Sequence, residues 1–108
     1  MTIGLPATIS SYLDAKNARD VDAMLAPFDE RAVVKDEGRE YHGIAEIRAW
    51  LENVTATYAA TFEAKDGTNA DGRTIVSVLV SGNFPGSPLL LDFAFTLSGE
   101  GIARLEIT

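Results

Sequence analysis

Residues 28–50 read FDERAVVKDEGREYHGIAEIRAW and combine the signals of two strands, a turn between them and the start of a helix. The two valines after Ala32 are β-branched and favour a pleated strand, and Gly38 stands where a chain reversal would place it. We therefore expect a short strand over residues 32–36, with Asp36 near its end, and a second strand after the turn.

The helix begins where the spacing of apolar residues changes to three and four. We expect it to run from Gly43 to about Tyr58, with Glu46 in its first turn, where a carboxylate is favourable against the helix dipole. Its apolar stripe consists of Ile44, Ile47, Leu51, Val54 and Tyr58.

Two shorter helices are expected before this segment. Pro6 suits the first turn of one helix, and Asp20 suits the N-cap of another that ends before Pro27. The stripe of the first helix comprises Leu5, Ile9, Tyr12, Leu13 and Lys16. This spacing puts Tyr12 on the buried side.

After residue 58 the sequence alternates between strand-like runs and turn signals. We expect strands near residues 61–69, 73–83, 87–98 and 102–108. The turn signals are Asp66-Gly67, Asp71-Gly72, Pro85-Gly86 and Gly99 to Gly101. For the strand over 73–83, two choices of the residues that face the core remain open: Val76, Val78 and Val80, or Ile75, Ser77, Leu79 and Ser81.

A turn centred on residue 100 fixes a register for the last two strands. It sets Phe93 opposite Ile107, Phe95 opposite Leu105 and Leu97 opposite Ala103, so that one face is apolar. The other face carries Leu90, Asp92, Ala94, Thr96, Arg104 and Glu106. This mixed surface suits solvent or a partner subunit.

Helices first and a meander of strands after them predict a single α+β domain over residues 1–108, in which three helices cover a curved sheet. A chain of 108 residues can bury one core but cannot hold separate cofactor and substrate domains. Hydrophobic residues at 46% and charged residues at 23% are ordinary for a globular protein.

The charge and cysteine content restrict the possible partners. The net charge is −7 and the basic residues are scattered singly, so binding to nucleic acid is not expected. The chain has no cysteine, which excludes disulfides and thiolate sites and fits a reducing cytoplasm. The N-terminal residues MTIGLPATISSYLD contain no basic leader and no long apolar run, so we expect a cytoplasmic protein without a membrane span.

The order of these elements and the segments FDERAVVKDEG and HGIAEIRAWL resemble the SnoaL-like branch of the nuclear transport factor 2-like superfamily. The resemblance covers nearly the whole chain and implies a cone-shaped fold. Members of the superfamily include isomerases, cyclases, dehydratases, hydrolases and proteins that only bind or assemble, so the fold alone does not assign a function.

The chain is also similar to the ketosteroid isomerases, which use an aspartate at the end of the first strand as a general base and a tyrosine of the first helix as an oxyanion donor. Asp36 and Tyr12 fall on these positions. The second acid of the isomerases falls on Phe93, next to Asp92, and their supporting tyrosine falls on Leu51. The resemblance thus implies catalysis by Asp36 and Tyr12 on an apolar carbonyl compound, without a cofactor.

Each of these residues also has a simpler interpretation. Asp36 accepts backbone hydrogen bonds at its turn, and Tyr12 is a core side chain with a locally satisfied hydroxyl. Several aromatic residues have two interpretations: they line an apolar pocket for a small flat molecule, or they belong to the hydrophobic core. They are Trp50, Tyr58, Phe62, Phe93 and Phe95.

His42 is the only histidine and titrates near neutral pH. It precedes Gly43 at the start of a helix, so we expect a capping or surface role rather than acid–base catalysis. The acids near it in sequence match no recognised metal-site spacing, and no metal is expected.

Two functions from different classes follow. One is an isomerase or cyclase that uses Asp36, and the other is a non-catalytic dimeric module that binds a small molecule or a protein. They differ in whether Asp36 and Tyr12 face a common open cavity. A homodimer is expected in either case, because the mixed outer face of the last strands is broad.

Overall fold

The computed structural model describes residues 4–99 and 101–108. Within these residues the chain forms a six-stranded sheet and three helices, in the order α1 (Ala7–Ala18), α2 (Val21–Leu25), β1 (Phe28–Asp36), β2 (Arg39–His42), α3 (Gly43–Tyr58), β3 (Thr61–Ala70), β4 (Arg73–Ser81), β5 (Leu89–Ser98) and β6 (Gly101–Ile107). The expected α+β class, with the helices in the N-terminal half, is confirmed.

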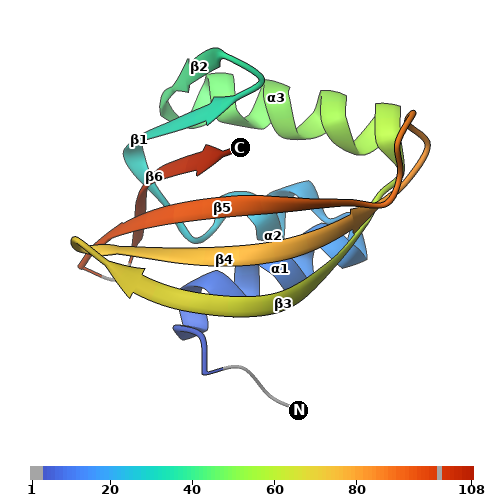
Figure 1. Ribbon diagram of the computed structural model, residues 1–108. Coiled ribbons are helices and arrows are strands. Elements are labelled where there is room, and N and C mark those ends of the chain that lie inside the picture. Colours follow the sequence, from blue (N-terminus) through green and yellow to red (C-terminus); the bar gives the residue numbers. More distant parts are fainter. Residues whose placement is uncertain (1–3, 100) are drawn as a thin grey trace.

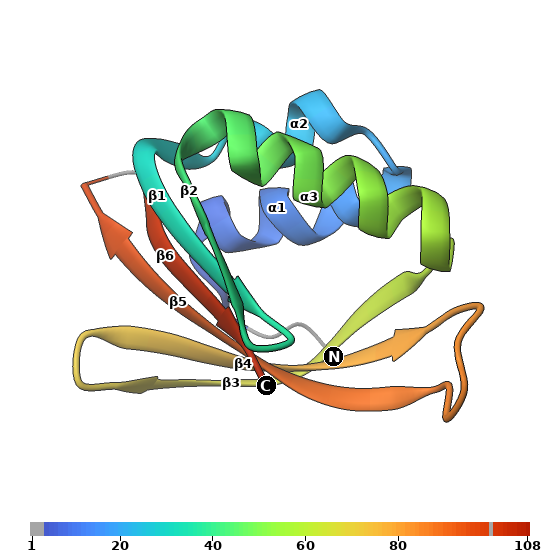
Figure 2. The same cartoon turned by 90° about the horizontal axis from the view of Figure 1, so that it is seen from above.

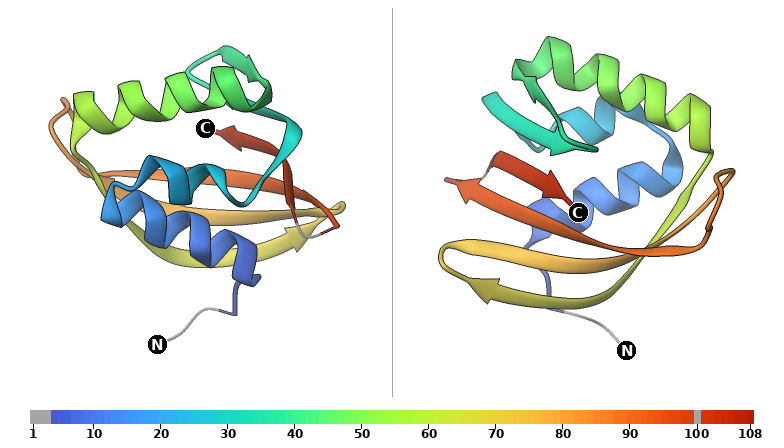
Figure 3. Two further views of the ribbon diagram at one scale, coloured as in Figure 1. Left: turned by 180° about the vertical axis from the view of Figure 1, so that it is seen from behind. Right: turned by 45° about the horizontal axis from the view of Figure 1, so that its top comes forward.

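The sheet is mixed and strongly curved (Figure 1). Its strand order is β2-β1-β6-β5-β4-β3, and β1 and β6 run parallel while the other neighbours are antiparallel. All three helices lie on one side of it, as Figure 2 shows from above and Figure 3 from two further directions. The apolar face of the sheet is therefore covered, and the opposite face of β4, β5 and β6 is left open. None of the described helices is long and apolar enough to cross a membrane.

The turn after β1 holds Asp36 in a defined place. Glu37 and Gly38 both have positive φ, at 54° and 78°, and Asp36 pairs directly with Arg39 across them. Two consecutive residues of positive φ make the tight hairpin turn whose twist matches that of the flanking strands. The predicted end of β1 at Asp36 is confirmed, but the strand begins four residues earlier than expected. Its first residue, Phe28, pairs with Ile102 of β6, a distant partner that the local pattern cannot reveal.

One predicted hairpin is wrong. The β3–β4 turn is Asp71-Gly72, and Asp66-Gly67 lies inside β3. The pairing shifts between Ala64 and Asp66, which leaves Lys65 as an extra residue. A β-bulge of this kind bends the strand without reversing it, and the Asp66 carboxylate accepts a hydrogen bond from the Gly67 N–H at 2.9 Å.

The register of the last strands is confirmed in part. Phe93 lies opposite Ile107 and Phe95 opposite Leu105, but Leu97 pairs with Ile102 and not with Ala103. The pairing shifts just before Leu97, another irregularity that sequence spacing does not show. The open choice in β4 is also decided, because the buried set is Val76, Val78 and Val80.

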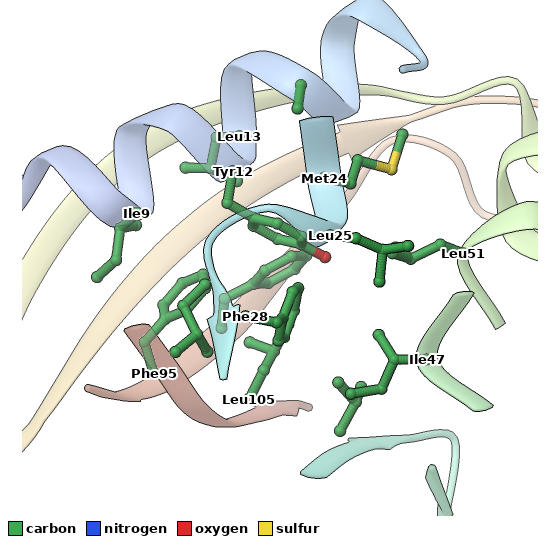
Figure 4. Close-up of a cluster of buried hydrophobic side chains, with 14 of the residues drawn as sticks. Ile9, Tyr12, Leu13, Met24, Leu25, Phe28, Ile47, Leu51, Phe95 and Leu105 are labelled. Carbon is green, nitrogen blue, oxygen red and sulfur yellow. The ribbon is translucent and has the colours of Figure 1, made fainter. Parts of the chain in front are cut away.

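The core joins the helices to the covered face of the sheet (Figure 4). Its fully buried members come from α1, α2, α3, β1, β4, β5 and β6, and include Ile9, Tyr12, Met24, Ile47, Leu51, Val76, Val78, Phe95 and Leu105. Each aliphatic or Phe side chain of this size contributes roughly 1.5–3 kcal/mol when it leaves water. This packing fixes α1 and α3 relative to the strands that carry the candidate site.

Candidate functional site

A pocket of about 360 Å³ lies between α3, the inner face of the long strands and the β4–β5 loop. Its aromatic lining comprises Trp50, Tyr58, Phe62, Phe84 and Phe93, and its aliphatic lining includes Val54, Val80, Leu89, Leu91 and Ile107. Four charged residues also line it, namely Lys16, Arg19, Asp36 and Glu37. An apolar cavity with few polar groups is the usual form of a small-molecule site.

Asp36 brings a carboxylate to this pocket from the end of β1. The indole Nε1–H of Trp50 donates a hydrogen bond to Oδ2 of Asp36, with the two atoms 3.1 Å apart. Burial raises the pKa of Asp36 above its ordinary value of 3.8, and Glu37 raises it further, while the Trp50 hydrogen bond and the charge of Lys16 lower it. The carboxylate is thus a stronger base than an exposed aspartate.

Trp50 is also held by a stacking contact on its ring face. It is 4% exposed, and its ring stacks on Tyr41 of β2 with centroids 5.8 Å apart and planes inclined by 29°. The turn after Asp36 returns the chain as β2, so the same hairpin supplies both the carboxylate and the aromatic partner. Trp50 therefore couples α3 to the β1–β2 hairpin and restricts the rotation of the Asp36 side chain.

Lys16 is a buried charged residue that lines the pocket. Its side chain, from the last turn of α1, belongs to a residue only 5% exposed, and its Nζ lies 4.6 Å from the ring centroid of Phe62 and 5.4 Å from that of Trp50. It makes no ion pair or hydrogen bond with any other described residue. Burial lowers the pKa of Lys16 from 10.5 to about 8, against the opposing effect of the Asp36 charge.

Tyr12 lies one helical turn before Lys16 on the same stripe, but it is not among the residues that line the pocket. It is fully buried, with its ring edge-on to Phe28 and Phe95 at 5.4 and 5.9 Å. Figure 4 shows its hydroxyl among hydrocarbon side chains, and that oxygen has no hydrogen-bond partner in the described part of the chain. Burial raises the pKa of Tyr12, so its hydroxyl stays protonated.

The residues singled out from the sequence thus fall into two groups. Asp36, Trp50, Tyr58 and Phe93 all line the pocket, whereas Tyr12 and Phe95 lie in the core beside it. Sequence reasoning did not assign a role to Lys16. The available signal was a lysine on an otherwise apolar helical stripe, four residues after Tyr12.

The family model for the SnoaL-like domain matches residues 9–103. The chain belongs to the SnoaL-like domain family. No curated protein matches it.

Solved structures agree with this family membership. A candidate polyketide cyclase from Sinorhizobium meliloti is 36% identical, with a TM-score of 0.92 over 96% of this chain and 95% of that chain. A candidate polyketide cyclase from Xanthomonas campestris is 23% identical, with a TM-score of 0.77 over 93% and 85% of the two chains. A hypothetical protein with a ketosteroid isomerase-like fold from Catenulispora acidiphila is 17% identical, with a TM-score of 0.81 over 99% and 86%. The last two show the fold alone.

Two further residues of this SnoaL-like domain lie away from the pocket. Asp92 projects from the outer face of β5, where it accepts a hydrogen bond from the Ser77 hydroxyl at 3.3 Å. His42 is an exposed residue at the N-cap of α3, and its ring lies 3.2 Å from a carboxylate oxygen of Glu40. The described residues contain no group of three or more histidine, cysteine or acidic side chains arranged to hold a metal.

Proposed function

We propose that this SnoaL-like protein is a cofactor-independent isomerase or cyclase that uses Asp36 as a general base on a flat, apolar carbonyl compound. The observation that carries the proposal is the Asp36 carboxylate on the wall of an aromatic pocket, held by the Trp50 N–H. A carboxylate with a raised pKa is better matched to proton abstraction near neutral pH than an exposed one.

The pocket favours a substrate of a particular shape. Its walls are aromatic rings, among them Trp50, Phe62 and Phe93, which accommodate flat ring systems. Its volume of about 360 Å³ suits a small molecule of few rings. The similarity to a candidate polyketide cyclase at 36% identity supports a carbonyl-rich substrate, because a carbon between two carbonyls readily loses a proton to a carboxylate.

The test is the pair Asp36→Asn and Asp92→Asn. Asp36→Asn retains the shape of the side chain and removes the base, so turnover should fall by several orders of magnitude while ligand binding persists. Asp92→Asn makes the same chemical change on the outer face of β5, away from the pocket, and should leave turnover unchanged. Substrates for the assay come from native mass spectrometry of protein purified from its own host, which identifies retained ligands.

A second candidate is the non-catalytic binding module. Two observations favour it. Phe93 stands where the resemblance to ketosteroid isomerases places their second acid, and the Tyr12 hydroxyl lies outside the pocket lining. In this case the pocket binds a small molecule without converting it. A retained ligand that the wild type never converts would favour the module over the enzyme. Full turnover by Asp36→Asn on any substrate found would instead overturn the assignment of Asp36 as the base.

A further inference from the structure

The ammonium group of Lys16 is a cation with unused hydrogen bonds. An ammonium carries three N–H donors, and within residues 4–99 and 101–108 none of them has an oxygen acceptor. Its neighbours are ring faces, with Nζ 4.6, 5.4 and 5.9 Å from the centroids of Phe62, Trp50 and Tyr12. Two of these rings, Phe62 and Trp50, belong to the pocket wall, so the free donors are available to a ligand there.

A buried charge without a hydrogen-bonding partner is costly, and removing it should favour the folded state. Cation–π contacts offset part of the cost, and so does the charge of Asp36 across the pocket. The remaining cost is removed when an anionic oxygen binds beside Nζ. The second cation of the pocket differs from Lys16, because Arg19 is exposed and donates a hydrogen bond to the carbonyl of Ala59 at 2.8 Å.

We propose that Lys16 is the oxyanion-binding residue of this pocket, and that its ligands are flat apolar molecules bearing one anionic oxygen, as an enolate or a phenolate. The enolate case rests on the function proposed above. Tyr12 and Lys16 are four residues apart on α1, and the shift by one helical turn moves the oxyanion donor from the core to the pocket wall.

The proton transfer then has a balanced form. A carbon next to the carbonyl loses its proton to the Asp36 carboxylate, and the electron pair of that C–H bond forms a carbon–carbon double bond. The carbonyl π pair moves onto oxygen, where the Lys16 ammonium donates a hydrogen bond to the developing negative charge. Return of the proton from Asp36 to another carbon gives an isomer. Alternatively, the enolate carbon bonds to a second carbonyl carbon and closes a ring, the π pair of that carbonyl moves onto its oxygen, and this alkoxide takes the proton from Asp36.

The test uses a nitronaphthol, a flat two-ring phenol whose ionised form absorbs visible light and which ionises below the pKa of Lys16. Its pKa when bound is read from absorbance during a pH titration. In the wild type this value should lie about one unit or more below that in Lys16→Met, because an adjacent opposite charge favours the ionised form. Lys35→Met, an exposed lysine of β1, should match the wild type. Equal pKa values in the wild type and Lys16→Met would overturn the proposal.

A second measurement requires no variant. Carbon-detected titration of the lysine side chains in the wild type should show the pKa of Lys16 rising from about 8 when nitronaphtholate saturates the pocket, while the resonances of exposed Lys35 and Lys65 stay unchanged. An unchanged pKa of Lys16 with bound ligand would contradict the proposal even if Lys16→Met failed to fold.

Asp36→Asn separates this inference from the proposed function. That variant should still bind nitronaphtholate as tightly as the wild type, or more tightly, because a negative charge is removed from the pocket. If the bound pKa of nitronaphthol is the same in the wild type and in Lys16→Met, while Asp36→Asn abolishes turnover, the oxyanion site alone is overturned. Conversely, if Asp36→Asn keeps its turnover and Lys16 still lowers the bound pKa of nitronaphthol, the assignment of Asp36 as the base alone is overturned.

Discussion

The indole nitrogen of Trp50 lies 3.1 Å from Oδ2 of Asp36 and donates a hydrogen bond to it. This contact joins α3 to the end of β1 at the wall of the pocket. It also opposes the effect of burial on the carboxylate, since a hydrogen bond to the ionised form lowers the pKa of Asp36. The base strength of Asp36 therefore depends on a residue that also shapes the cavity.

Trp50→Phe should raise the pKa of Asp36 further, because the ring remains but the N–H donor is lost. The acidic limb of the pH–rate profile should then move to higher pH, and a carbon-detected titration of Asp36 should show the same direction. Tyr41→Phe serves as the control, since it retains the stacked ring pair and leaves the hydrogen bond in place. A profile that does not move would mean that the Trp50 contact has no effect on the base.

Trp50→Ala should destabilise the fold by about 3–5 kcal/mol, the usual range for removing a large buried aromatic side chain. The side chain is 4% exposed and loses both its stacking on Tyr41 and its packing against the pocket wall. Urea unfolding gives the value, with Asp14→Ala on α1 as an exposed control that should change stability by at most about 0.5 kcal/mol. A loss below about 1 kcal/mol would show that the ring contributes little packing.

Tyr12→Phe should leave turnover unchanged and increase stability by about 1 kcal/mol. The hydroxyl of Tyr12 is buried without a hydrogen-bond partner among the described residues, and removing an unsatisfied polar group relieves its desolvation cost. The ring contacts with Phe28 and Phe95 persist in the variant. Thermal melting and steady-state kinetics measure the two effects. A large loss of turnover would instead assign the oxyanion role to Tyr12, as the resemblance to ketosteroid isomerases implies.

Lys16→Met should stabilise the protein at neutral pH while weakening the binding of anionic ligands. The folded state lowers the pKa of Lys16 from 10.5 to about 8, so below pH 8 folding carries the cost of a buried charge, up to about 3 kcal/mol for a shift of this size. Between about pH 8 and 10.5 the unfolded chain binds the proton and the folded chain does not, so wild-type stability rises with pH.

This difference gives a direct measurement. Urea unfolding of the wild type and of Lys16→Met at neutral pH and near pH 10 should show the advantage of the variant shrinking as pH rises. Lys65→Met, at an exposed site, controls for the loss of a lysine charge. An advantage that stays constant with pH would mean that the Lys16 ammonium is not desolvated in the folded state.

The sequence predicted the elements whose signals are local. The helix over 43–58 has a regular apolar stripe, and the pairing of Phe93 with Ile107 follows from alternation along two neighbouring strands. The extra residue at Lys65 and the shift before Leu97 were missed, because a bulge depends on the partner strand and not on the residue alone.

The candidate site was predicted less completely than the fold. Asp36 and Trp50 stand in elements with clear boundaries, and both line the pocket. Lys16 and Tyr12 share a helical stripe, and the spacing alone does not tell which of them meets a cavity and which meets the core. That distinction depends on how α1 lies against β3. There the side-chain oxygen of Asn17 accepts a hydrogen bond from the Phe62 N–H at 2.7 Å, and its side-chain nitrogen donates one to the Phe62 carbonyl at 2.8 Å.

The expected homodimer remains a prediction, and the structure offers a sharper test of it. The outer face of β5 and β6 is not covered by a helix, and Leu90 on it is 61% exposed, while its neighbours Leu89 and Leu91 line the pocket. An exposed apolar side chain on an open sheet face favours association with a second copy. On the same face Arg104 lies 2.8 Å from Glu106 and 3.4 Å from Glu40, an arrangement that a symmetric partner can share.

Sedimentation equilibrium should therefore give twice the chain mass of 11.6 kDa at micromolar concentration. Leu90→Lys and Arg104→Glu should both shift the equilibrium toward monomer, the first by placing a charge in the apolar contact and the second by setting three carboxylates together. Ala49→Lys, an exposed site on α3 away from this face, should remain dimeric. A wild type that sediments as a monomer at high micromolar concentration would rule out the dimer, and a dimer insensitive to both changes would place the interface on another surface.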